Sequence, residues 1–240
     1  MITVNLQGGI GNTLFQYAYA RALPNAQLYD ACRQYGCHLT RFNTKLPFTT
    51  HPEGRWISER GLPYDPHPEI EDPSVQNGYW QCEKYFTHIA GELKKEFTLR
   101  DTPSASAQQC AKKIAEAPNS IMVHARRGDY LTWAKERHGV LPTEYYTQAA
   151  KHFTDPHFFL FSDDPSYTIS LPHTRISCLP HEDLWLMSLC KHAVIANSSF
   201  SWWGAWLGAD TTGIVIAPKQ WFTKGNEDAR DIVPSRWIKI

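Results

Sequence analysis

The sequence predicts an α/β protein built on parallel sheets. In the second half of the chain, short apolar runs alternate with amphipathic segments, as in the strand pattern "SIMVHAR" and the helix pattern "PTEYYTQAAKHF" that follows it. The chain opens in the same way, because "ITVN" leads through a glycine turn into a helical pattern from Leu14 to Ala22. Strands that alternate with helices are joined by right-handed crossovers and form parallel sheets. We therefore expect Rossmann-like sheets, whose ligands bind beyond the carboxyl ends of the strands.

The individual elements follow from local patterns. Residues 24–73 are rich in Pro, Gly and His and are expected to be mainly loops with brief strands. A strand that leads into a helix is expected over 77–86, with the helix continuing through 87–99. The later strands are expected at 120–126, 157–164, 175–179, 193–197 and 213–218, and the later helices at 142–153, 181–192 and 199–209.

The small polar residues near position 100 indicate a domain boundary. We expect an N-terminal domain over 1–100 and a C-terminal domain over 101–240, whose last residues can pack back on the first domain. If the two sheets face each other, the polar clusters at their strand ends converge on one cleft.

Composition excludes several classes of protein. Lys and Arg together number 24, as do Asp and Glu, so the chain lacks the basic field that nucleic-acid binding requires. No signal peptide or integral membrane segment is indicated. The six cysteines form no C-x-x-C pair, so free thiols are expected in a cytoplasmic protein, either soluble or peripheral to the inner face of the membrane.

The stretch "NSSFSWWGAW" places a row of hydroxyl and amide side chains at the start of a predicted helix. These residues are Asn197, Ser198, Ser199 and Ser201. Together with the free backbone N–H groups at the positive end of the helix dipole, they are typical of a phosphate site. The alternative is a simple N-cap, with the tryptophans packed in the core.

The stretch "HARRGDY" places two arginines at the end of a predicted buried strand. One guanidinium can present a fork to a phosphate, and Asp129 can hold the other in a structural ion pair. The alternative, an internal bridge without a ligand, accounts for only one of Arg126 and Arg127. His124 alternates with Arg126 along the strand, and Asp129 and His124 are the candidates nearest in sequence for a catalytic base.

Two further strand ends carry candidate ligand contacts. In "GGIGN", residues Gly9, Gly11 and Asn12 form either a tight turn or a backbone edge that a substrate approaches closely, and the third glycine of a dinucleotide fingerprint is replaced by Leu14. In "FSDDP", one carboxylate is expected to cap the next turn and the other, Asp163, to bind a ribose or base. We predict no metal.

Aromatic side chains make up 13% of the sequence, with nine tryptophans. Such side chains stack on sugar faces, although most of them must pack in the core. The candidates for acceptor contact are Tyr79, Trp80, Trp133 and Trp221.

The blocks "HARRGDY", "NGYWQCEKYF", "FSDD" and "DLWLMSLCKHAVIANSSFSWWGAWL" resemble the α-1,2-fucosyltransferases of glycosyltransferase family eleven, and "GGIGNTLFQYAYARAL" is similar to that family's opening segment. The resemblance implies a GT-B-like architecture, with an acceptor-side first domain and a second domain that binds GDP-fucose. It also implies fucose transfer to a terminal β-galactoside of a glycan, with inversion and without a metal or other cofactor.

Carried onto this chain, the resemblance makes Arg126 the residue that binds the β-phosphate, with Arg127 and Asp129 as its partners. Two other classes remain alternatives. A non-catalytic glycan-binding module accounts for the tryptophans but not for the arginine pair, and an NAD-dependent oxidoreductase accounts for the sheet but not for the missing glycine.

Overall fold

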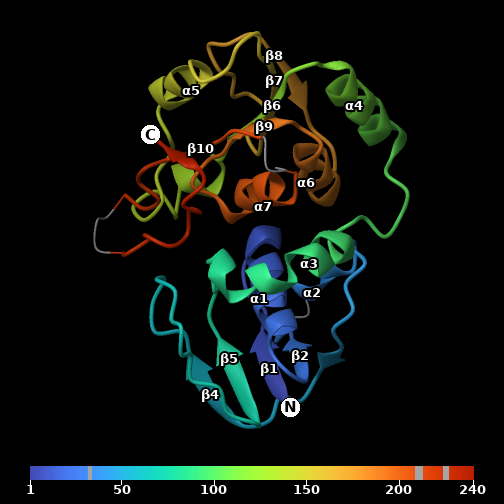
Figure 1. The fold of residues 1–240 in the computed structure, drawn as a ribbon, viewed down its shortest axis with the longest axis vertical. Helices are drawn as coiled ribbons and strands as arrows, with labels where there is room; N and C mark the ends of the chain where they lie inside the picture. Colours follow the sequence, from blue (N-terminus) through green and yellow to red (C-terminus); the bar gives the residue numbers. More distant parts are fainter. Residues whose placement is uncertain (32–33, 209–212, 224–226) are drawn as a thin grey trace. The chain divides into compact units, whose positions relative to one another are not determined.

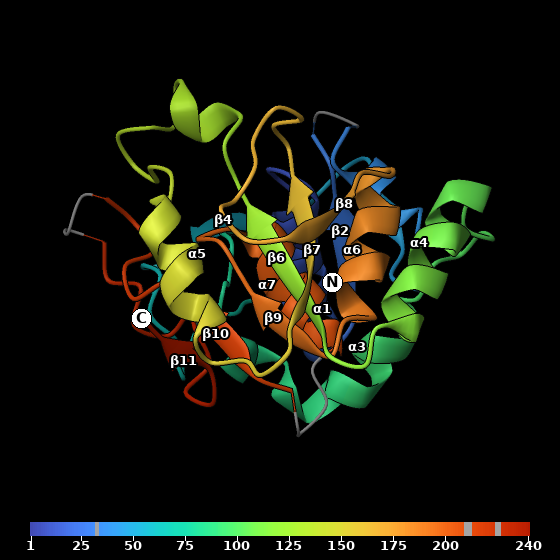
Figure 2. The same cartoon turned by 90° about the horizontal axis from the view of Figure 1, so that it is seen from above.

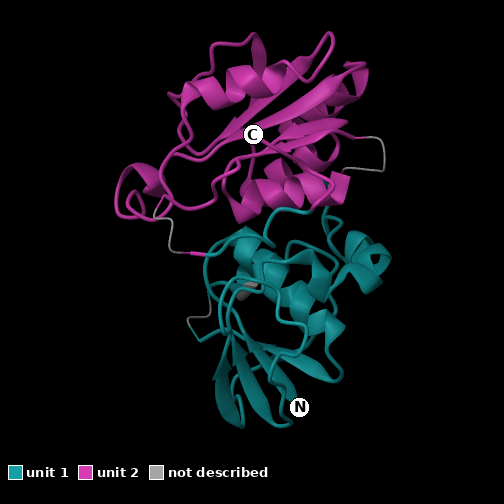
Figure 3. Cartoon of the chain, turned by 60° about the vertical axis from the view of Figure 1, so that its left-hand side comes forward, with its two compact units in different colours: residues 1–102, 228–234 teal, residues 103–227, 235–240 magenta. Residues whose placement is uncertain are grey.

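The chain forms two compact units in a computed structural model, which describes residues 1–31, 34–208, 213–223 and 227–240. The first unit comprises residues 1–102 and 228–234, and the second comprises 103–227 and 235–240 (Figure 3). Each unit contains its own parallel sheet. The expected α/β class with two parallel-sheet domains is therefore confirmed. Within the described residues, no helix combines the length and the apolar character needed to cross a bilayer.

The first unit has a five-stranded sheet in the order β3-β2-β1-β5-β4 (Figure 1). Its strands are β1 (Ile2–Asn5), β2 (Ala26–Tyr29), β3 (Phe48–Thr49), β4 (Arg55–Ser58) and β5 (Ser74–Asn77). Its helices are α1 (Ile10–Ala22), α2 (Gly36–Leu39), η1 (Glu83–Tyr85), η2 (Thr87–Ile89) and α3 (Ala90–Glu96). The order reverses between β1 and β5, which makes their carboxyl ends the switch point of this sheet.

The strand expected from Asn77 onward is wrong in position, because β5 ends at Asn77. Beyond it, Trp80 adopts a left-handed backbone conformation with a φ of 47°. Such a conformation does not continue a strand. The chain instead turns, and the segment that follows forms short 3-10 helices before α3.

The second unit has a six-stranded parallel sheet in the order β11-β10-β9-β6-β7-β8. Its strands are β6 (Ser120–Ala125), β7 (His157–Ser162), β8 (His173–Ile176), β9 (His192–Val194), β10 (Val215–Ala217) and β11 (Ile238–Lys239). Its helices are α4 (Ala105–Glu116), η3 (Asp129–Leu131), α5 (Thr143–Ala150), α6 (Pro180–Ser188) and α7 (Ser199–Gly208). The order reverses between β6 and β9, so the switch point lies where these two strands end.

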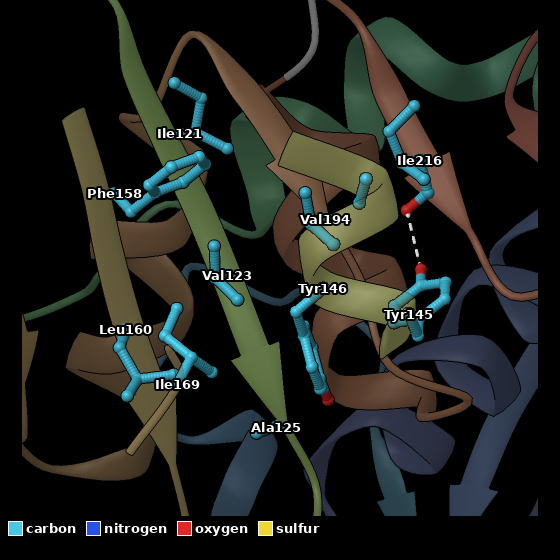
Figure 4. Close-up of a cluster of buried hydrophobic side chains, with 11 residues drawn as sticks. Ile121, Val123, Ala125, Tyr145, Tyr146, Phe158, Leu160, Ile169, Val194 and Ile216 are labelled. Atoms are coloured by element: carbon cyan, nitrogen blue, oxygen red, sulfur yellow. Dashed lines mark hydrogen bonds between the residues drawn. The ribbon is translucent and has the colours of Figure 1, made fainter. Parts of the chain in front are cut away.

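Helices cover both faces of this second sheet (Figure 2). On one face, Ile121 and Val123 of β6 pack with Tyr145 and Tyr146 of α5 in a buried cluster (Figure 4). Because side chains alternate along a strand, His124 points to the opposite face. There its ring lies 5.7 Å from that of Phe200 in α7. The side chain two residues after His124, that of Arg126, is therefore directed to the same face of the sheet, on the side of α7.

Candidate functional site

The arginine pair lies at the carboxyl end of β6, the central strand at the switch point of the second unit. Arg126 is held between two carboxylates. Its Nε donates to Oδ1 of Asp129 at 2.9 Å, its Nη2 forms an ion pair with the same oxygen at 2.7 Å, and its Nη1 lies 3.1 Å from Oδ2 of Asp163. The Arg126 side chain nevertheless keeps 34% of its surface exposed. The guanidinium is thus oriented by the protein and still accessible to an anion.

Arg127 is engaged differently. Its Nε donates to Oδ2 of Asp164 at 3.0 Å, and its guanidinium stacks 4.2 Å above the ring of Tyr167. Its backbone N–H donates to Oδ1 of Asp163 at 2.8 Å. Arg127 therefore braces the loop, which leaves Arg126 as the arginine better placed to meet a ligand.

The two aspartates after β7, Asp163 and Asp164, make different contacts, and one of the two matches the expectation from the sequence. Asp164 caps the next turn, because its Oδ1 accepts from the backbone N–H and the hydroxyl of Ser166 at 2.9 and 2.6 Å. These hydrogen bonds, followed by that of Arg127, lower the pKa of Asp164. Asp163 was expected to bind a ribose or base, but both of its oxygens hold the arginine loop. In this structure Asp163 orients Arg126, and its contact with a ribose or base stays a prediction.

The helix start after β9 differs from the expected outward row of polar side chains. Asn197 is buried, and its amide donates to the carbonyls of His138 and Trp221 at 2.9 and 3.1 Å. Ser201 is also buried and donates to the carbonyl of Ser198 at 3.3 Å. The expectation that the side chains of Asn197 and Ser201 face outward is therefore wrong, and their contact with the donor stays a prediction. Ser198 is also buried and Ser199 is half-buried, so Ser199 is the one of these four polar side chains that keeps surface exposed at the helix start.

The arginine loop and the helix start belong to one site. The hydroxyl of Tyr130, in the arginine loop, donates to the carbonyl of Asn197 at 3.0 Å. The ring of the same tyrosine lies 5.6 Å from the guanidinium carbon of Arg126. Tyr130 thus joins the ends of β6 and β9, where a parallel sheet of this topology binds its ligand.

His124 does not fit the role of a catalytic base. Its side chain is 3% exposed, and its Nδ1 has no hydrogen-bond partner in the described part of the chain. Burial, followed by the charge of Arg126, lowers its pKa to about 3. An imidazole with so low a pKa remains neutral and binds a proton only weakly.

The buried His124 should make the fold sensitive to acid. Its pKa is lower in the folded than in the unfolded chain, so stability is lost as pH falls below about 6.5. Between pH 7 and pH 5 this single group is expected to remove about 2 kcal/mol from the free energy of unfolding. Denaturant titrations of the wild type and His124→Gln at both pH values test this. Equal losses in the two proteins would contradict it.

In the first unit, the glycine turn follows β1 at that unit's switch point. Gly8 has a φ of 80°, a conformation that favours glycine. A Cβ on Gly9 would meet no atom within 4 Å, so no described neighbour requires glycine there. Gly11 is buried in α1, and Oδ1 of Asn12 accepts from Gln81 at 2.8 Å. The open space at Gly9 is compatible with a closely approaching ligand, and the donor contacts expected of Gly9, Gly11 and Asn12 remain predictions.

The aromatic candidates differ in their surroundings. Trp133 is 82% exposed and Tyr79 is half-buried, so both offer surface to a ligand. Trp80 is 2% exposed and stacks on Tyr19 with ring centroids 4.2 Å apart, and Trp221 is also buried. Neither buried indole presents a free face for stacking on a sugar.

One carboxylate in the first unit, that of Glu59, was not predicted from the sequence. Glu59 directly follows β4, and its two oxygens accept from the backbone N–H groups of Tyr79 and Trp80 at 2.8 and 3.0 Å. Burial raises the pKa of this carboxyl. Glu59 lies in the Pro-rich stretch and is 20 residues from its partners, so no local pattern pointed to it.

A search of the described ranges finds no cluster of three or more His, Cys, Asp and Glu side chains suited to a metal ion. The polar groups of the second unit's site are instead a guanidinium, its carboxylate partners and the start of a helix. This donor set suits an anionic ligand such as a diphosphate.

Comparison with known proteins places these features in a family. The chain is 29% identical to an α-1,2-colitosyltransferase of Escherichia coli, with 100% of this chain and 99% of that protein covered. It is 35% identical to the E. coli O-antigen biosynthesis glycosyltransferase WbnK over 54% of this chain and 47% of that protein. It is 27% identical to the rat galactoside α-(1,2)-fucosyltransferase 1 over 87% of this chain and 64% of that protein.

Solved structures share the fold. The fucosyltransferase NodZ from Bradyrhizobium matches with a TM-score of 0.53 and 12% identity, covering 85% of this chain and 92% of that one. E. coli ADP-heptose lipopolysaccharide heptosyltransferase II matches with a TM-score of 0.50 and 10% identity, covering 100% and 89%. These similarities agree with the GT-B-like fold class expected from the sequence. Residues 69–240 match the model of glycosyl transferase family 11, and the chain therefore belongs to that family of glycosyltransferases.

Proposed function

We propose that this glycosyltransferase is an inverting α-1,2-fucosyltransferase that moves fucose from GDP-fucose to the 2-hydroxyl of a terminal β-galactoside. The proposal is based on the position of Arg126. Asp129 and Asp163 orient its guanidinium at the switch point of the second unit, and the side chain remains partly exposed. The rat relative named above is a galactoside α-(1,2)-fucosyltransferase, and a NodZ crystal was soaked with GDP-fucose. Family membership favours this activity over a glycan-binding module or an NAD-dependent oxidoreductase.

The proposed reaction is a single displacement. The acceptor oxygen forms a bond to the anomeric carbon of fucose while the bond from that carbon to the β-phosphate oxygen breaks, and the acceptor proton passes to a base or to solvent. The leaving GDP gains negative charge in the transition state. Groups that bind its diphosphate more strongly in the transition state than in the ground state therefore accelerate the reaction. Arg126 and the N–H groups at the start of α7 supply this stabilisation without a metal.

Asp129 serves this mechanism by orienting Arg126. Its Oδ1 already accepts a hydrogen bond from Nε of that guanidinium and forms an ion pair with Nη2. With Asp129 so engaged and His124 buried, we assign the base to neither residue.

Colitosyl transfer is the second candidate, because the relative that matches along the whole chain is an α-1,2-colitosyltransferase. Colitose lacks the 3-hydroxyl group that fucose carries, so the two donors separate the candidates. The purified protein should be mixed with GDP-fucose or GDP-colitose and a panel of β-galactosides, and released GDP and the new linkage should be measured. GDP release that requires a galactoside, with an α-1,2 product, supports transfer. If GDP is released from neither donor, the proposed transfer is refuted.

A further inference from the structure

The most exposed large apolar side chain of the described residues is that of Trp133, in the segment that follows the arginine pair. It keeps 82% of its surface exposed. Within the described ranges, no hydrogen bond, ion pair or ring contact engages its indole. Single exposed apolar side chains are common on protein surfaces, so exposure alone does not identify a ligand site. The position of Trp133 relative to Arg126 is what makes its exposure informative.

Trp133 lies in a turn that closes on Asp129. The carbonyl of Asp129 accepts from the backbone N–H groups of Thr132 and Ala134 at 3.1 and 3.0 Å, and from the hydroxyl of Thr132 at 3.2 Å. Ala134 is also buried. The two residues that flank Trp133 are therefore tied to one carbonyl, which fixes the backbone of Trp133 while its indole stays in solvent.

The same aspartate orients Arg126, because Oδ1 of Asp129 accepts from the guanidinium Nε at 2.9 Å. Residues three and four apart on a helical turn lie about 5–6 Å from each other. Trp133 therefore begins about one turn from the residue that orients Arg126. In the proposed reaction, a single fucosyl ring separates the β-phosphate from the acceptor. A tryptophan at this separation can reach the acceptor sugar.

The far end of the segment is anchored as well. The ring of His138 stacks on that of Tyr130 with centroids 4.6 Å apart, and the carbonyl of His138 accepts from the amide of Asn197 at 2.9 Å. The carbonyl of Arg137 accepts from the backbone N–H of Thr223 at 2.8 Å. A surface held in this way loses little conformational freedom when a ligand binds to it.

The charges around Trp133 favour a neutral ligand. Its exposed neighbours in the turn include Lys135 and Glu136, which carry opposite charges. Binding to an anionic lipid surface depends instead on a cluster of basic side chains. An aromatic face with balanced charges beside it suits the C–H surface of a neutral sugar.

We propose that the indole of Trp133 stacks on the acceptor galactose, against the face that carries the C–H bonds at positions 3, 4 and 5. The inference rests on the proposed function, because it takes the acceptor to be a β-galactoside. It adds the residue that recognises this sugar. Trp133 is then a specificity-determining residue, and Asp129 positions it together with Arg126.

The stereochemistry of the sugar determines what this contact selects. The 4-hydroxyl of galactose is axial, so it points to one face of the ring and leaves the C–H bonds at positions 3, 4 and 5 together on the other. In a glucoside the 4-hydroxyl is equatorial, and the C–H bond at position 4 points to the opposite face from those at positions 3 and 5. Stacking on Trp133 therefore favours galactosides over glucosides, and it leaves the 2-hydroxyl free at the edge of the ring.

Replacing the indole tests the contact. Trp133→Ala should keep the wild-type thermal stability, because the side chain is exposed and the tie to Asp129 is made by the backbone of its neighbours. Its KM for methyl β-galactoside should rise about tenfold, as expected for the loss of one aromatic contact, while the KM for GDP-fucose stays unchanged. The ratio of kcat/KM for methyl β-galactoside to that for methyl β-glucoside should fall in the same variant.

Two other substitutions separate stacking from general apolar contact. Trp133→Phe keeps an aromatic face and should recover part of the acceptor affinity. Trp133→Leu keeps an apolar side chain without that face and should resemble Trp133→Ala. A wild-type KM in Trp133→Leu would show that stacking is not what binds the sugar.

Trp56→Ala is the matched control. Trp56 is 51% exposed in β4 of the first unit, where its ring meets that of Tyr29 edge-on at 6.3 Å. Its replacement should leave the KM for methyl β-galactoside unchanged. If Trp133→Ala likewise keeps the wild-type KM, the inference is overturned.

Binding without transfer separates this inference from the proposed function. Saturation-transfer NMR of methyl β-galactoside with the wild type and with Trp133→Ala needs no donor. Contact of the sugar protons at positions 3, 4 and 5 with the wild type, and its loss in the variant, supports the stacking even if neither donor is consumed. Transfer activity with identical acceptor spectra for the two proteins supports the proposed function and refutes the stacking. The stacking is likewise refuted if Trp133→Ala loses only the binding of the wild type to phosphatidylglycerol vesicles.

Discussion

Arg126→Ala is expected to lower turnover on the order of a hundredfold or more while the protein remains folded. In the folded protein, two carboxylates hold this guanidinium at the switch point of the sheet. Under the proposed function this guanidinium is the positive charge and the fork that meet the leaving diphosphate, so its removal should lower kcat and also raise the KM for the donor. Asp129 and Asp163 are partly exposed, and water then screens their charges. The stability cost should therefore be about 1 kcal/mol or less.

Two further variants sharpen this result. Arg126→Lys keeps the charge but cannot contact both Asp129 and Asp163 with a planar fork, so it should recover only part of the activity. Lys112→Ala, which removes an exposed cation of α4 in the same unit, should retain full turnover. The comparison uses initial rates of GDP release, with circular dichroism to verify folding. Wild-type turnover in Arg126→Ala would remove Arg126 from the mechanism.

The centre of the second unit was predictable because β6, β7 and β9 are mainly apolar and each is followed by a distinctive polar cluster. The run before Arg126 is buried on both faces, as a central parallel strand must be, and the strand expected at 120–126 is found at Ser120–Ala125. The first unit gave weaker signals. Its strands β2 to β4 are two to four residues long and lie among Pro and Gly residues, where no periodicity develops.

Side-chain direction at the site was less predictable than element position. Asn197 and Ser201 share the polar character of Ser199, but packing of α7 on its own sheet buries the first two and not the third. That outcome depends on contacts with His138 and Trp221, which are distant in sequence.

The second large effect is expected from a substitution at Gly208, where α7 packs against α6. A Cβ on Gly208 would lie 2.2 Å from the backbone oxygen of Ser188, a contact that no side-chain rotation relieves. Gly208→Ala must therefore push the two helices apart, and α7 begins two residues after Asn197, whose carbonyl accepts from Tyr130 of the arginine loop. We expect a loss on the order of 3 kcal/mol in the free energy of unfolding, measured by denaturant titration, together with a raised KM for the donor.

Two other glycines provide matched controls for the same substitution. A Cβ on Gly204 would lie 2.7 Å from the Cβ of Met187, which the backbone of α6 fixes in place, but this overlap is smaller than the one at Gly208, so Gly204→Ala should cost less than Gly208→Ala. A Cβ on Gly91 in α3 would meet nothing within 4 Å, and alanine there should stabilise the protein by roughly 0.5–1 kcal/mol through helix propensity. Loss of stability should thus follow the order Gly208, Gly204, Gly91. Equal effects at Gly208 and Gly204 would show that α7 adjusts its position freely, and the close contact with Ser188 would then not be what holds the helix start beside Arg126.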